Sequence, residues 1–153
     1  MVFLLKKLTT DRFLKISLII GGVYDLILGI NLLFIPDILI YILDLINFSV
    51  SKPENMLFVQ TSALFLIAVG YMLLYAAYYA PVKFAFIGMS SAVIRLGYAL
   101  IVLFTAATKG VEPGFLLTAI TDSLTGLLLI LALIMTEGVS WKQLCKYSPS
   151  NNT

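Results

Sequence analysis

The sequence predicts an all-α fold: an integral membrane bundle of four transmembrane helices with a short interfacial helix between the first and the second. Hydrophobic residues make up 61% of the 153 residues and charged residues only 12%, and the mean hydropathy is +1.04. Soluble domains are nearer half apolar and a quarter charged. Four apolar runs reach the length of about 20 residues that spans a bilayer. This length suits one bundle, so we expect residues 1–153 to form a single transmembrane domain.

The first spanning helix is expected over residues 14–35. Lys6 and Lys7 precede it, as they would precede the apolar part of a signal peptide. The apolar run is too long for that, however, and lacks a cleavage site of small residues, which favours a retained anchor helix. Pro36 ends the helix, because proline interrupts helical hydrogen bonding.

Residues 37–48 form an apolar run that is too short to cross a bilayer. Its polar residues Asp37, Tyr41 and Asp44 fall on one stripe of a helix. We therefore expect an amphipathic helix that lies in the membrane interface or folds over the mouth of the bundle.

The other three spanning helices are expected over residues 56–79, 84–107 and 115–135. Ala80-Pro81 ends the second of them, which predicts a tight hairpin with the third. Residues 109–114 read as a turn, and Pro113 lies where the first turn of the fourth helix would tolerate it.

The distribution of basic residues predicts the orientation of the bundle. One side of the predicted membrane holds Lys6, Lys7, Arg12, Lys15, Lys83, Lys142 and Lys146. The other side holds Lys52 and Lys109, accompanied by Asp37, Asp44, Glu54 and Glu112. Because Lys and Arg are enriched in cytoplasmic loops, we expect the cytoplasmic membrane as the location, with both termini in the cytoplasm.

Three of the spanning segments carry an ionisable residue at depth: Asp25, Arg95 and Asp122. Each such charge costs roughly 2.5–3.5 kcal/mol even on the gentlest insertion scale, so they are expected to pair or to face a wet cavity. The helical rise places Asp25 and Arg95 about 16 Å deep from the cytoplasmic side, and Asp122 about 10 Å below the outer face. These levels differ by less than an arginine can reach, so all three side chains are expected to meet. With both carboxylates ionised, the trio carries one surplus negative charge.

The neighbours of these charges suggest which helix faces point inward. Small or hydroxyl residues share their faces: Gly22 and Gly29 with Asp25, Gly88, Ser91 and Tyr98 with Arg95, and Thr118 and Thr125 with Asp122. Such residues favour close helix packing and hydrogen bonds between helices. The further candidates for this buried polar network, or for a ligand or proton site built on it, are Tyr24, Asn31, Gln60, Tyr98 and Thr118. Asn31 and Gln60 lie nearer the outer face and would extend the polar interior into a cavity that opens outward.

The composition argues against several classes of function. The chain has no histidine and a single cysteine, Cys145, so we expect no metal, no redox pair and no cofactor. The net charge of +2 is too small to indicate nucleic acid as a partner.

The aromatic residues near the hairpin between the second and third spanning helices are expected to form an interfacial belt; they are Tyr71, Tyr75, Tyr78, Tyr79, Phe84 and Phe86.

Several stretches of the chain resemble the DoxX-like group of small four-helix prokaryotic membrane proteins. The similar stretches are Gly21–Pro36, Gln60–Tyr71, Val93–Val102 and Ala119–Leu129. Some proteins of this group are associated with quinone-linked respiratory enzymes, so the resemblance implies a role as a partner subunit. It assigns no site residues.

The sequence therefore favours a non-catalytic subunit or assembly partner of a larger membrane complex. Its expected partners are membrane lipids and either other membrane protein subunits or further copies of the chain. The alternative is a small proton-coupled carrier, or a lipid- or quinone-binding protein, that uses the same network. A lipid-modifying enzyme with Asp25 and Asp122 as an acid and base pair is the third possibility. The network itself either holds the helices together or forms a binding site for a ligand or a proton.

Overall fold

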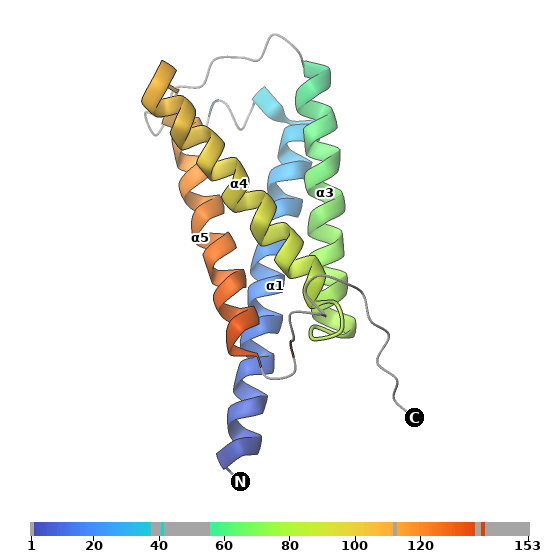
Figure 1. Ribbon diagram of the computed structural model, residues 1–153. Helices are drawn as coiled ribbons and strands as arrows, with labels where there is room; N and C mark the ends of the chain where they lie inside the picture. Colours follow the sequence, from blue (N-terminus) through green and yellow to red (C-terminus); the bar gives the residue numbers. More distant parts are fainter. Residues whose placement is uncertain (1, 38–40, 42–55, 112, 137–138, 140–153) are drawn as a thin grey trace.

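The computed structural model describes residues 2–37, 41, 56–111, 113–136 and 139, and all regular secondary structure in these ranges is helical (Figure 1). The long helices are α1 (Val2–Phe34), α3 (Met56–Tyr79), α4 (Ala85–Lys109) and α5 (Pro113–Met135). Each contains a stretch that is long and apolar enough to cross a membrane. The prediction of four such helices is confirmed. The short helix predicted over 37–48 lies outside the described residues, apart from Asp37 and Tyr41.

Helix α1 begins at Val2, earlier than the start predicted at residue 14. Its apolar span, Asp11–Phe34, begins close to the prediction. The difference arises because apolar length marks where a span begins, whereas a helix continues until something interrupts it. Residues 2–13 contain neither glycine nor proline.

Local features of the backbone explain where α3 gives way to α4 and where α4 ends before α5. After α3 ends at Tyr79, the amide of Phe84 donates to the carbonyl of Ala80 (3.0 Å), and α4 begins at the next residue. At the other end, Gly110 follows α4 with φ 78°, a left-handed conformation that glycine adopts without strain. Pro113 then opens α5.

The helices pack as two pairs, α1 with α3 and α4 with α5. In the half that contains Lys15 and Lys83, side chains from all four helices form one buried core: Leu14, Leu18, Leu73, Ala76, Ala77, Ala85, Ala92, Leu129, Ala132 and Leu133. In the other half, the buried cluster of Ala99, Val102 and Ala119 comes from α4 and α5 alone. The two pairs are joined at one end and diverge toward the other (Figure 1).

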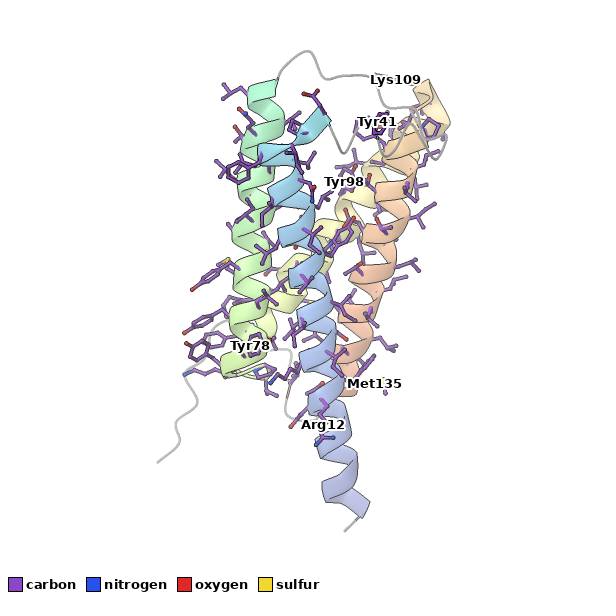
Figure 2. The ribbon with its side chains drawn as sticks, turned by 180° about the vertical axis from the view of Figure 1, so that it is seen from behind. Arg12, Tyr41, Tyr78, Tyr98, Lys109 and Met135 are labelled. Carbon is purple, nitrogen blue, oxygen red and sulfur yellow. The ribbon has the colours of Figure 1, made fainter. Side chains whose placement is uncertain are left out.

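The outer surface of the bundle is apolar along all four helices. Among its exposed side chains are Ile27, Phe65, Leu100 and Leu124, one from each helix. Such a continuous apolar surface suits lipid or a partner protein rather than water. The polar markers lie at its ends: Arg12 and Tyr78 at one, and Tyr41 and Lys109 at the other (Figure 2).

Candidate functional site

The structure brings the three deep ionisable side chains into direct contact. Arg95 of α4 donates through Nη2 to Oδ1 of Asp25 on α1 (2.6 Å) and through Nη1 to Oδ1 of Asp122 on α5 (2.5 Å). Both are charge-assisted hydrogen bonds, which are shorter and stronger than neutral ones. One guanidinium therefore links three helices, and it joins the α1–α3 pair to the α4–α5 pair.

Two further polar groups contact the guanidinium. Its Nε donates to Oγ of Ser91 (3.3 Å), and its Nη2 has a longer contact with the carbonyl oxygen of Gly21 (3.4 Å). Only 7% of the Arg95 side chain is exposed, so these contacts replace water around a buried cation. They explain how the fold tolerates a permanent charge at this depth.

Tyr24 adds an aromatic wall to the network. Its ring centroid lies 5.3 Å from Cζ of Arg95, within the range of a cation–π interaction. Its hydroxyl forms a hydrogen bond with that of Thr121 (3.0 Å), so the ring is tied to α5 as well as to the cation. The network thus includes four charged or aromatic side chains from three helices.

Glycines set the distances between the helices around this network. A Cβ atom added to Gly70 of α3 would lie 2.8 Å from the Gly22 carbonyl oxygen and 3.0 Å from Cβ of Asp25. On the opposite side, a Cβ on Gly126 would lie 3.3 Å from the carbonyl oxygen of Ala92. Asp25 is therefore backed closely by α3 while its carboxylate binds Arg95.

The two carboxylates are not equivalent. The Asp25 side chain is 2% exposed and that of Asp122 is 17% exposed. Both bind the same cation, so the formal charges of the trio sum to −1 when both are ionised. Asp122 is the member through which the network most readily meets its surroundings.

Within the described residues, no hydrogen bond joins the other candidate residues to the three charges. Tyr98 and Thr118 form their own hydrogen bond between α4 and α5 (2.9 Å). Asn31 donates to the carbonyl of Ile27 in its own helix (2.7 Å), and Gln60 is exposed on α3.

A shallow open pocket of about 160 Å³ lies on α1, beside Tyr24 of the network. Its lining residues are Tyr24, Ile27, Leu28 and Asn31. The phenol of Tyr24 and the amide of Asn31 are its polar groups, and both already have hydrogen bonds. The outward cavity expected from the sequence was polar and included Gln60, whereas this one is lined largely by aliphatic side chains and does not include it.

Two contributors to the network did not emerge from the sequence. Gly70, which backs Asp25, is the single glycine between residues 56 and 79, and that isolation in an apolar helix was an available signal. The carbonyl of Gly21 has no sequence signal, because every helical residue carries a carbonyl oxygen.

The chemistry open to this arrangement is narrow. The described residues contain no group of three His, Cys, Asp or Glu side chains that could hold a metal ion. What the network offers is a fixed buried cation and two carboxylates, with a shallow apolar pocket on α1 beside it. Comparison of the chain with protein-family models, with curated proteins and with solved structures finds no match.

Proposed function

We propose that this chain is an integral protein of the cytoplasmic membrane that serves as a non-catalytic subunit or assembly partner of a larger membrane complex. Four apolar spans and an apolar outer surface support the membrane location. The basic end of the bundle, with Arg12, Lys15 and Lys83, faces the cytoplasm in this proposal. The resemblance to DoxX-like proteins implies the same kind of role.

One observation carries the non-catalytic role: a single guanidinium binds both deep carboxylates. A general acid or base needs a carboxylate that is free to exchange a proton with its substrate. Here Asp25 and Asp122 are engaged by Arg95, and polar contacts of this kind hold membrane helices together. The bundle is therefore suited to keep a fixed shape, which is what a partner in an assembly requires.

The test is purification from native membranes in a mild detergent, followed by native mass spectrometry. We expect this chain to travel in a fixed ratio with one or more larger membrane proteins. An unrelated four-helix membrane protein, tagged and purified in the same way, controls for nonspecific capture. Recovery of this chain as a lone species, or with the same proteins as the control, would contradict the proposal.

A second candidate function rests on the shallow open pocket beside the network, which Tyr24 and Asn31 of α1 line. In this alternative the chain is a small proton-coupled carrier or a lipid- or quinone-binding protein, and the surplus negative charge of the trio is where a proton binds. Transport into proteoliposomes tests the carrier. Uptake of a cationic or polar solute, driven by a proton gradient, should be lost in the Asp25→Asn variant, while the thermal stability of this variant in detergent stays near that of the wild type. Equal uptake by wild type and variant would exclude this version.

A further inference from the structure

We propose that the aromatic surface at the Lys15–Lys83 end of the bundle binds one class of lipid, an anionic phospholipid, through its phosphate and its ester carbonyls. This inference rests on the membrane location proposed above but not on the subunit role. The surface is centred on the tyrosine stripe, which we define as Tyr71, Tyr75, Tyr78 and Tyr79 of α3.

The stripe is a continuous exposed surface. Its members follow the spacing i, i+4, i+7 and i+8, which places them on one side of the helix. Tyr71, Tyr78 and Tyr79 are 64%, 66% and 73% exposed. The rings also contact one another: the centroids of Tyr71 and Tyr75 are 6.4 Å apart, and those of Tyr75 and Tyr79 are stacked at 4.4 Å.

The stripe differs in direction from the interfacial belt expected from the sequence. A belt places aromatic rings around a bundle at one depth, at the level of the lipid headgroups. From Tyr79 to Tyr71 the stripe instead runs along the helix axis for about 12 Å. If Tyr79 lies at the headgroup level, Tyr71 lies at the depth of the hydrocarbon.

A phenol at that depth needs a hydrogen-bond acceptor, because an unpaired hydroxyl in hydrocarbon is costly. Within the part of the chain that the structure describes, none of the four stripe hydroxyls has a protein acceptor. The ester carbonyls of a phospholipid lie just below its phosphate and are acceptors. A lipid aligned along the stripe would therefore satisfy the hydroxyls of Tyr75 and Tyr78, which lie within about one helical turn of Tyr79.

Two lysines flank the stripe at the end where Tyr79 lies. Nζ of Lys15, on α1, lies 5.3 Å from the ring centroid of Tyr78. Nζ of Lys83 lies 5.9 Å from the centroid of Phe84, and Phe84 packs edge-on against Tyr75 at 5.5 Å. The two cations thus come from different elements and approach the same aromatic surface from two sides.

The balance of charge at this end selects the headgroup. Among the described residues, Arg12 adds to the two lysines, and Asp11 is the acidic side chain beside them on α1. The net positive charge of these described residues complements a phosphate that is not neutralised by a choline or an ethanolamine. Basic residues near an anionic membrane surface each contribute binding free energy.

The experiment is a lipid titration of the full chain, purified in a neutral detergent, with phosphatidylglycerol or phosphatidylcholine. Bound lipids are counted by native mass spectrometry, and thermal unfolding is followed in parallel. We expect the wild type to retain phosphatidylglycerol preferentially and to unfold at a higher temperature with it. The double variant Lys15→Gln/Lys83→Gln should lose affinity for this lipid by about fivefold per lysine, the equivalent of about 1 kcal/mol each.

The matched control is Lys109→Gln, which removes an exposed lysine from the opposite end and should leave the preference unchanged. Equal retention of the two lipids, or an equal loss in this control, would overturn the proposal. Stabilisation by glycerophosphate alone would replace the lipid with a free phosphate ester and would overturn it too. If the double variant does not fold, Tyr75→Phe/Tyr78→Phe decides, because it keeps both rings and removes the two hydroxyls nearest to the ester carbonyls: unchanged retention of phosphatidylglycerol contradicts the proposal. A chain that remains in the aqueous fraction would instead refute the membrane location.

Discussion

Replacing Arg95 with leucine is expected to destabilise the bundle by about 3–5 kcal/mol, the usual cost of removing one partner from a buried ion pair. The substitution leaves Asp25 and Asp122 without the cation that both contact. It also removes the polar link between the two helix pairs. Reversible unfolding of the purified protein in mixed micelles, followed by circular dichroism, measures the effect.

Two variants make this result specific to the network. Lys109→Leu is the same type of change at an exposed helix end and should have little effect. The triple variant Arg95→Leu/Asp25→Asn/Asp122→Asn removes the buried charges together, so it should recover much of the lost stability. Wild-type stability in Arg95→Leu alone would show that the carboxylates do not depend on the guanidinium.

The outcome also helps to decide whether the network has a purely structural role or binds a proton or ligand. If the network only holds the helices together, neutral residues can replace it with little functional loss. A network that binds a proton or ligand loses its function in the triple variant even when the bundle is stable. The triple variant should therefore be tested both for co-purification with larger proteins and for uptake in proteoliposomes.

The sequence was sufficient to predict the four apolar spans and the level of the charges. Apolar length identifies a span, and the constant rise of a helix places Asp25, Arg95 and Asp122 at comparable depths. The expectation that they meet follows from the cost of isolated charges in a membrane and requires no knowledge of how the helices pack. The structure places them within hydrogen-bonding distance.

The pairing of the helices could not be predicted in the same way. Interior and lipid-facing residues of a membrane bundle are both apolar, so hydropathy does not reveal which face of α3 packs on α1. Local hydrogen bonding also competes with contacts between helices, as it does for Asn31, whose amide donates to its own helix. The sequence analysis placed Asn31 in a polar interior because its side chain is polar. In the structure, Asn31 instead lines a pocket that is largely apolar.

Replacing Gly70 with alanine is expected to destabilise the α1–α3 pair by about 1–3 kcal/mol, the range for overpacking a tight contact. The new methyl group would lie 2.8 Å from the carbonyl oxygen of Gly22, and a backbone atom cannot rotate away as a side chain can. Gly97→Ala is the matched control, since a Cβ at Gly97 would have nothing within 4 Å. The control should be neutral or slightly stabilising, because alanine favours the helix over glycine by about 1 kcal/mol. Equal unfolding transitions for the two variants would contradict the close contact.

The same substitution tests whether helix packing holds the ion pairs together. The methyl group on Gly70 would also lie 3.0 Å from Cβ of Asp25, so relief of the clash moves this carboxylate relative to Arg95. Arg95→Leu should then cost less in the Gly70→Ala background than in the wild type. A double-mutant cycle measures this as a coupling of about 0.5–3 kcal/mol, the range for residues in one contact network. Additive effects would mean that α3 packs behind Asp25 without positioning it.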